Sequence, residues 1–243
     1  MTTNYNPRIV TDGLVLALDA GNPKSYPGSG TLITDLIGSG ENGIMSNMDA
    51  SNHNSDGYFT FDGSNEYITV TKSNFFTSYS QQITMEAWVY IPSSATWSNG
   101  FFGNIFTRGN FAGSHGLWRS SNNNQVAFYC RQLDPVDSQN SFANISRDTW
   151  YQLVGVWNAG TKLYVNGELI DSDSASFTGE TENNENEASG GGGSFNIGQN
   201  TAASSNFGNY FEGRQAANKI YNRELTASEV KQNFDALRGR FEI

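Results

Sequence analysis

The chain has 243 residues with a formal net charge of −10, and its 14 lysines and arginines are scattered singly along the sequence. Because phosphate groups bind to clustered positive charge, this distribution argues against nucleic acid and against an anionic membrane as partners. No apolar run approaches the length of a membrane span, and the N-terminal residues lack the charged and apolar regions of a secretory signal. The 26 glycines and only 16% charged residues are typical of a protein built from many strands and turns.

Short β-branched and aromatic segments recur along the first half of the chain and predict an all-β fold. Residues 1–12 are expected to form an extended arm, which is followed by a predicted strand at 13–20 and a polar loop up to about residue 57. The next predicted strands are 58–70 (split by a turn at 62–65), 81–92, 103–109, 115–120 and 125–131. In 81–92, apolar residues alternate with Glu86, Trp88 and Tyr90, so one face of this strand is expected in the core. Cys130, the only cysteine, is expected to be a buried apolar side chain.

The segment from Trp150 to Ile170, WYQLVGVWNAGTKLYVNGELI, predicts three short antiparallel strands. Turns are indicated by Asn-Ala-Gly at 158–160 and by Asn-Gly at 166–167, which supplies the positive φ angles of a two-residue hairpin turn. Strand alternation places Trp150 and Trp157 on opposite faces of the sheet. We interpret the segment as scaffold rather than as a binding site.

Residues 172–194 combine clustered acidic residues with four consecutive glycines. Such a composition predicts a flexible surface loop, because ordering it costs backbone entropy and buries few side chains. A calcium-coordinating acidic loop is the alternative, although the carboxylates do not have the spacing of a known calcium loop.

One short amphipathic helix is predicted near the C-terminus. Thr226 and Glu229 form a capping box, which marks the start of the helix. Apolar residues, among them Val230 and Phe234, recur at helical spacing and form one face of the helix. Leu225 is expected to pack against Val230 as a hydrophobic staple at the start of the helix. Gly239 is expected to close the helix.

Few residues have the character of a catalytic group. His53 and His115 lie among Asn, Ser and Gly and are expected to be surface residues, and the sequence has no nucleophile elbow and no zinc-ligand cluster. Glycoside hydrolysis needs two carboxylates across a cleft, and Glu86 is the only acidic residue well inside a predicted strand. We therefore expect no catalytic residue, with Glu86 as the candidate acid if the chain is a hydrolase.

The loop at 93–104, SSATWSNGFFGN, is the candidate ligand-binding segment. Its aromatic and amide side chains suit the apolar faces and hydroxyl edges of sugars, and they equally suit a protein interface. The alternative is that the rings fold down onto the sandwich. The candidate binding residues are Trp97, Asn99, Phe101 and Phe102.

Five segments occur in an order that resembles the concanavalin A-like lectin/glucanase superfamily, and most of all its laminin-G-like, pentraxin-like jelly roll. They are YFTFDGSNEYITV, ITMEAWVY, WYQLVGVWNAGTKLYVNGELI, SFNIGQN and FEGRQAANKIYNRELTASEV, and the resemblance extends over about residues 58–236. It implies an all-β, two-sheet antiparallel jelly-roll sandwich with one short C-terminal helix. Because no linker separates a second domain, residues 13–243 are expected to form a single domain.

The N-terminal segment RIVTDGLVLALDAGNPKSYPGSGT, followed by TDLIGSGENGIM, looks like the start of laminin-G-like proteins of tailed bacteriophages, including those that infect cyanobacteria. This resemblance implies a non-enzymatic virion protein at the particle surface, as a capsid or tail decoration or a fibre component. Its expected partners are other virion proteins or host-surface polysaccharide, and it is expected to be oligomeric or assembled on a particle. The alternatives are a host-glycan-binding adhesin module and a divergent glycoside hydrolase.

One departure from the family concerns metal binding. The last long strand of the family typically carries two adjacent acids, of which the aspartate often helps to hold calcium, whereas this chain has Ala216 and Ala217 at those positions. Alanine cannot coordinate a hard cation, and Asp62 alone makes a weak site. We therefore expect no tightly bound calcium and no other cofactor.

Overall fold

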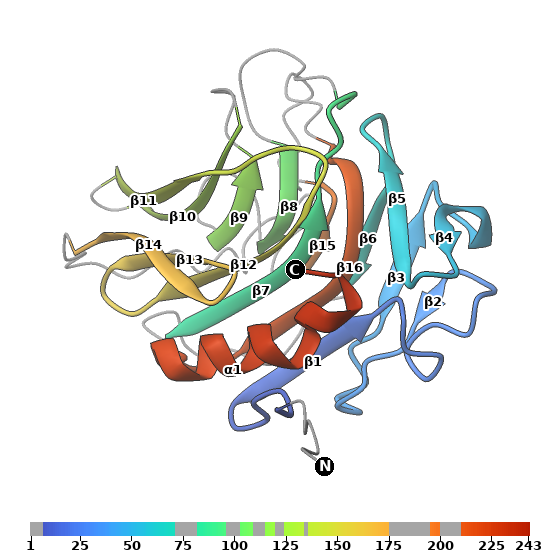
Figure 1. Ribbon diagram of the computed structural model, residues 1–243, viewed down its shortest axis with the longest axis horizontal. Helices are drawn as coiled ribbons and strands as arrows, with labels where there is room; N and C mark the ends of the chain where they lie inside the picture. Colours follow the sequence, from blue (N-terminus) through green and yellow to red (C-terminus); the bar gives the residue numbers. More distant parts are fainter. Residues whose placement is uncertain are drawn as a thin grey trace.

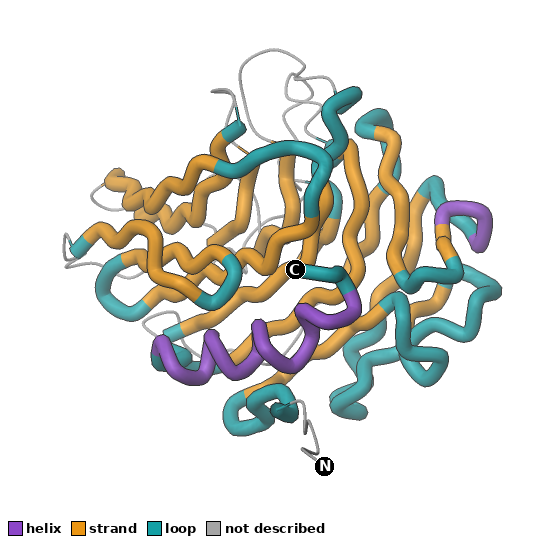
Figure 2. Tube along the Cα trace, viewed as in Figure 1, coloured by secondary structure: helices purple, strands orange, loops and turns teal. Residues whose placement is uncertain are grey.

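The computed structural model describes residues 7–70, 82–95, 103–108, 115–119, 124–133, 136–174, 195–199 and 210–243. Within these ranges two antiparallel sheets pack face to face, and the helix α1 (Ala227–Leu237) lies across the outer face of one of them (Figures 1 and 2). This confirms the predicted all-β sandwich with one short C-terminal helix. No helix among the described residues has the length and hydrophobicity needed to cross a membrane.

The sheet beneath α1 is called the helix-covered sheet, and the other is called the opposite sheet. In spatial order the helix-covered sheet contains β14 (Glu168–Asp173), β13 (Thr161–Val165), β12 (Trp150–Trp157), β7 (Ile83–Tyr90), β16 (Glu212–Tyr221), β5 (Tyr58–Asp62) and β4 (His53–Asn54), with β1 (Leu14–Asp19) pairing with β16. The opposite sheet contains β11 (Val136–Asn144), β10 (Gln125–Leu133), β9 (His115–Arg119), β8 (Gly103–Arg108), β15 (Phe195–Ile197), β6 (Tyr67–Val70), β3 (Gly43–Ser46) and β2 (Leu32–Ile33). The described residues also include the short 3-10 helices η1 (Ala50–Asn52) and η3 (Arg238–Arg240).

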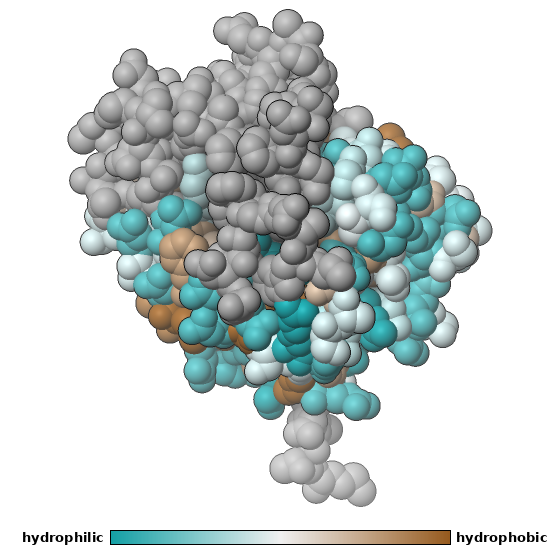
Figure 3. Space-filling view, turned by 90° about the horizontal axis from the view of Figure 1, so that it is seen from above, coloured by the Kyte–Doolittle hydropathy of each residue, from teal (hydrophilic) through white to brown (hydrophobic). Residues whose placement is uncertain are grey.

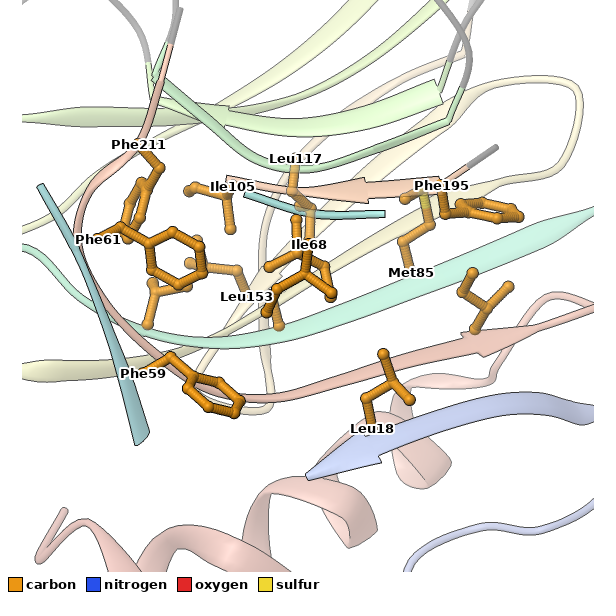
Figure 4. Packing of buried hydrophobic residues seen from close by; sticks show 14 of the residues in the cluster. Leu18, Phe59, Phe61, Ile68, Met85, Ile105, Leu117, Leu153, Phe195 and Phe211 are labelled. Carbon is orange, nitrogen blue, oxygen red and sulfur yellow. The ribbon is translucent and has the colours of Figure 1, made fainter. Parts of the chain in front are cut away.

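The main core fills the space between the two sheets (Figure 4). Alternation along β7 sends Met85, Ala87 and Val89 into this core, while Trp88 lies on the outer face against α1. This confirms the predicted orientation of the strand. Cys130 is fully buried in the same core, as expected. The described surface seen in Figure 3 is mostly hydrophilic, with small hydrophobic areas between.

The segment from Trp150 to Ile170 forms three antiparallel strands, β12, β13 and β14, as predicted. Asn166 and Gly167 have φ angles of 53° and 82°, which are the positive values that the hairpin turn requires. Trp157 is buried in the core between the sheets, whereas Trp150 lies on the outer face and contacts the ring of Phe241. The two tryptophans therefore lie on opposite faces, as strand alternation predicts.

The predicted start of the helix is correct and its predicted end is wrong. Thr226 and Glu229 form the capping box: the Glu229 backbone N–H donates to Thr226, and the Thr226 backbone N–H donates to the Glu229 carboxylate. Gly239 does not close the helix, because the chain continues from Leu237 into η3. This extra turn brings Phe241 onto Trp88, with ring centroids 4.4 Å apart, and such aromatic packing contributes about 0.5–1.5 kcal/mol beyond area burial.

A buried polar network fastens α1 to the sheet. Glu86 is fully buried and accepts hydrogen bonds from Trp88 Nε1 at 3.1 Å, Lys219 Nζ at 2.7 Å and Asn233 Nδ2 at 2.8 Å. Asn233, on α1, accepts in turn from the backbone N–H of Val10 at 2.8 Å. One carboxylate thus connects β7, β16, the helix and the N-terminal segment.

The described part of the expected N-terminal arm packs on its own domain. The backbone carbonyls of Arg8 and Val10 accept hydrogen bonds from Gln232 on α1 and from the hydroxyl of Tyr221. Arg223 donates to the backbone carbonyl of Asp12 and forms an ion pair with its carboxylate. Residues 8–12 are therefore held by the C-terminal third of the chain.

Candidate ligand-binding groove

The helix leaves part of the outer face of its sheet open. At the uncovered end, β12, β7 and β16 place Trp150, Tyr90 and Arg214 directly beside one another in register. Because paired residues in antiparallel strands point to the same face, these three side chains form a continuous row across the sheet. Trp150, Tyr90 and Arg214 are all half-buried, so each presents part of its surface to solvent.

This row borders a groove of about 500 Å³, which is within the usual range for small-molecule sites. We call it the C-terminal groove, because the last residues of the chain form one of its walls. The C-terminus lies in front of β7 and β16 in Figure 1. The groove is lined by Asp56, Tyr58, Trp150, Arg214, Arg240, Phe241 and Glu242.

The aromatic side of the groove is built around Trp150. Its ring centroid lies 4.7 Å from that of Phe241, 5.7 Å from that of Tyr58 and 5.8 Å from that of Tyr90. Phe241 is buried, whereas Tyr58 and Trp150 remain partly exposed. The neighbouring rings hold the indole in place, since aromatic pairs at these distances attract one another.

The cationic side of the groove is Arg214. Its guanidinium carbon lies 5.0 Å from the ring centroid of Tyr58 and 4.5 Å from that of Tyr90, which are favourable cation–π distances. Among the described residues no hydrogen bond or ion pair to the Arg214 side chain is found. The two rings therefore position the guanidinium while its N–H donors stay available.

Arg240 has a different role. It forms an ion pair with Asp19 at 2.6 Å and donates to the backbone carbonyl of Gly57. These contacts fasten the C-terminal segment to β1 and to the turn before β5, and so fix the wall formed by Phe241 and Glu242. Arg240 is thus a structural support of the groove.

Burial raises the pKa of the Tyr90 phenol above its ordinary value, and the nearby Asp148 carboxylate raises it further. Arg214 acts in the opposite direction and lowers the pKa of the same phenol. Asp148 accepts a hydrogen bond from the backbone N–H of Ser93 at 2.7 Å, which lowers the pKa of its carboxyl. Tyr90 is therefore neutral and Asp148 is ionised at neutral pH.

A bulge in β16 brings the groove and the buried ion pair onto one face. Between the pairs Gln215–Val89 and Asn218–Ala87, the two alanines at 216 and 217 lie opposite the single residue Trp88. The extra residue shifts the alternation, so that Lys219 faces Glu86 on the same side as Arg214. Both alanines are buried in one apolar cluster with the rings of Trp88, Phe234 and Phe241.

The alanines that replace the acids expected from the family thus lie beneath the C-terminal segment. The Asp62 carboxylate accepts a hydrogen bond from the backbone N–H of Ser64 at 2.7 Å. Across the part of the chain that the structure describes, no three His, Cys, Asp or Glu residues are grouped closely enough to hold a metal ion. The absence of bound calcium stays a prediction.

The other candidates from the sequence are placed as follows. Glu86 is fully buried and its oxygens are occupied by three donors, so it is a structural carboxylate. His53 is half-buried, with its ring 4.9 Å from that of Tyr26 and its Nε2 atom 2.9 Å from the carbonyl oxygen of Ala20. His115 begins β9.

Trp97, Asn99, Phe101 and Phe102 lie outside the described residues, and so does the part of the expected flexible loop from 175 to 194. Residues 172 and 173, at the start of that expected loop, belong to β14 instead. Trp150, interpreted from the sequence as scaffold, lines the groove.

The chain is similar in fold to several solved receptor-binding domains. The binding domain of botulinum neurotoxin serotype D matches with a TM-score of 0.65 and 13% identity, over 92% of this chain and 52% of that chain. The serotype D ligand-binding domain in complex with N-acetylneuraminic acid matches with a TM-score of 0.64 and 15% identity, over 92% of this chain and 51% of that chain. The serotype G binding domain matches with a TM-score of 0.60 and 15% identity, over 90% of this chain and 50% of that chain. The chain spans about half the length of these domains, and identities this low establish a likeness of fold alone.

At the level of sequence, no curated protein matches the chain. A family model described as the concanavalin A-like lectin/glucanases superfamily matches residues 61–231, which is more than half of the chain. The two-sheet antiparallel sandwich agrees with that match. The chain therefore belongs to the concanavalin A-like lectin/glucanase superfamily.

Proposed function

We propose that the chain is a non-catalytic carbohydrate-binding module and that the C-terminal groove holds the sugar. The observation that carries the proposal is the half-buried indole of Trp150 on the wall of a groove of about 500 Å³. A sugar ring has an apolar face of C–H groups, which stacks on an aromatic ring, and an edge of hydroxyls, which needs polar partners. The groove offers both, with Tyr58 and Trp150 for the face and Asp56, Arg214 and Glu242 for the edge.

Two further findings support a binding role. Glu86, the candidate acid if the chain were a hydrolase, is fully buried in an ion pair with Lys219 and is therefore inaccessible to a substrate. The superfamily contains lectins, and the serotype D neurotoxin domain of similar fold was solved with N-acetylneuraminic acid. A lectin-like role accounts for the groove without requiring a catalytic pair.

Replacement of Trp150 tests this function. A glycan array with the wild-type protein identifies bound sugars, and Trp150→Ala is expected to weaken the affinity at least about tenfold, which corresponds to about 1.4 kcal/mol. Trp150→Phe keeps an aromatic face and is expected to retain most of the affinity. Calorimetry measures the affinities, and melting temperatures show whether each variant is folded.

The matched control is Trp97→Ala, in the loop first considered as the binding segment. It is expected to bind the same sugar as the wild type does. Normal affinity in Trp150→Ala together with lost affinity in Trp97→Ala would transfer the site to the 93–104 loop. An array on which the wild-type protein binds no glycan, with calcium or with a chelator, would contradict the proposed function.

We further propose that the module acts at the surface of a tailed-bacteriophage particle, bound to other virion proteins and directed at host-surface polysaccharide. This placement is supported by the likeness of residues 8–45 to the start of phage laminin-G-like proteins. A virion component is expected at fixed stoichiometry in mass spectra of purified particles. Its absence from particles would contradict the placement and leave sugar binding untouched.

A further inference from the structure

We infer that the C-terminal groove selects acidic saccharides, with Arg214 binding a sugar carboxylate. The inference rests on the proposed function, because it assumes that the groove holds a sugar. It begins from the contacts of the Arg214 side chain, which packs against the rings of Tyr58 and Tyr90 and has no carboxylate partner among the described residues.

This arrangement differs from that of the other charged arginine of the groove. Arg240 is neutralised by Asp19 at 2.6 Å, so its charge is already used within the chain. A guanidinium carries five N–H donors in a planar fork and no acceptor, and it cannot lose its proton at physiological pH. When such a group lines a groove without an internal partner, the ligand that best satisfies it is a carboxylate, which accepts two parallel hydrogen bonds.

The positions of the rings make the fork ready to bind. Tyr90 and Arg214 are cross-strand neighbours on β7 and β16, and Tyr58 lies on β5 at the other side of β16. The contacts of both rings with the guanidinium limit its movement, so less conformational entropy is lost when a ligand binds. Trp150 follows in the same row, next to Tyr90. A sugar stacked on the indole would therefore lie beside the cation that recognises its carboxylate.

Two acidic residues of the lining act against an anionic ligand. Asp56 and Glu242 are both exposed. Exposed charges are weakened by solvent and by salt, whose screening length is about 8 Å at physiological ionic strength. A half-buried guanidinium in direct contact with the ligand is screened less. We therefore expect the attraction between Arg214 and a sugar carboxylate to exceed the repulsion from Asp56 and Glu242. We also expect the preference for acidic sugars to decrease as salt is added.

The experiment uses matched pairs of oligosaccharides on an array. One member of each pair contains glucuronic or galacturonic acid, and the other is the same chain after reduction of each carboxylate to a hydroxymethyl group, which gives glucose or galactose. The wild-type protein is expected to bind the acidic member of at least one pair about tenfold or more tightly than its neutral partner. Arg214→Gln is expected to abolish this preference, so that it binds the acidic and the neutral member of the pair with equal affinity.

Two variants control for charge and for folding. Arg214→Lys keeps the charge but loses the planar fork, and it is expected to retain only part of the preference. Arg238→Gln removes the same charge from the exposed end of the helix, outside the groove lining, and is expected to bind as the wild type does. Melting temperatures of all variants show whether a loss of binding reflects a loss of folding.

The outcomes separate this inference from the proposed function. Equal affinity for acidic and reduced members, or binding of neutral glycans only, would overturn the acidic preference and leave the carbohydrate module intact. A preference that persists in Arg214→Gln would overturn the role of Arg214. Binding to no glycan at all would overturn both proposals.

Discussion

Replacement of Glu86 by glutamine is expected to lower the free energy of unfolding by about 3–5 kcal/mol, the usual cost of removing one partner of a buried ion pair. The side chains of Glu86 and Lys219 are 0% and 6% exposed, so water cannot solvate the lysine that the substitution leaves unpaired. The glutamine NH2 group would also face donors, because Trp88 and Asn233 both donate to the carboxylate. Urea unfolding measures the loss as a lower midpoint at an unchanged slope.

Two further variants show whether the loss comes from the buried charge. In the double variant Glu86→Gln with Lys219→Met, the unpaired cation is gone, and we expect roughly half of the lost stability to return. Asp235→Asn breaks an exposed pair with Lys231 on the helix and is expected to cost less than about 0.5 kcal/mol. A midpoint of Glu86→Gln close to that of the wild type would contradict the assignment of this carboxylate as a structural one.

Replacement of Gly155 by alanine is expected to cost about 2–3 kcal/mol, because it overfills the core between the sheets. A Cβ atom at Gly155 would lie 2.0 Å from Cδ2 and 2.4 Å from Cγ of Phe128, whose side chain is fully buried. Gly155 is on β12 and Phe128 on β10, so the ring from the opposite sheet packs directly on the backbone of the helix-covered sheet. Because Phe128 is fully buried in the main core, its ring can move away from the new methyl group only by displacing other core side chains.

A double variant tests this explanation. Phe128→Leu leaves space for the new methyl group, so Gly155→Ala with Phe128→Leu is expected to be more stable than the sum of the two single losses by about 0.5–3 kcal/mol. Gly239→Ala is the control, since a Cβ atom at Gly239 has no neighbour within 4 Å. It is expected to change stability by less than about 1 kcal/mol. Additive losses in the double variant would show that contact with Phe128 is not the cause.

The sequence was most informative where local chemistry decides the structure. Alternation along β7 correctly predicts that Met85 and Trp88 lie on opposite faces of the sheet. The capping box of Thr226 and Glu229 correctly predicts where the helix begins. The strand β11 was not predicted, because its sequence VDSQNSFAN is mostly polar, and it forms by pairing with β10 at the edge of the sheet. Similarly, β2, β3 and β4 lie within the expected polar loop, and their short lengths of two to four residues leave no periodicity to detect.

The groove could not be predicted in the same way, because its residues are brought together by tertiary structure. Tyr58, Trp150, Arg214 and Phe241 come from four distant parts of the chain. The bulge at 216–217 determines which of the following residues of β16 face outward. Two alanines in sequence do not predict a bulge. One signal was present in the sequence: strand alternation places Trp150 and Trp157 on opposite faces, so one of the two rings must lie on the outer face, where it needs either a cover or a ligand.

The most direct test of the sugar-binding groove is a titration of the ¹⁵N-labelled protein with a sugar identified on the array, followed through the tryptophan indole N–H signals. Each signal is assigned by a Trp→Phe variant. We predict that the Trp150 signal shifts progressively with sugar concentration, while that of Trp157, buried between the sheets, stays in place. A Trp150 signal that remains unchanged at saturating sugar, with the shift appearing at Trp97 instead, would contradict the assignment of the groove as the binding site.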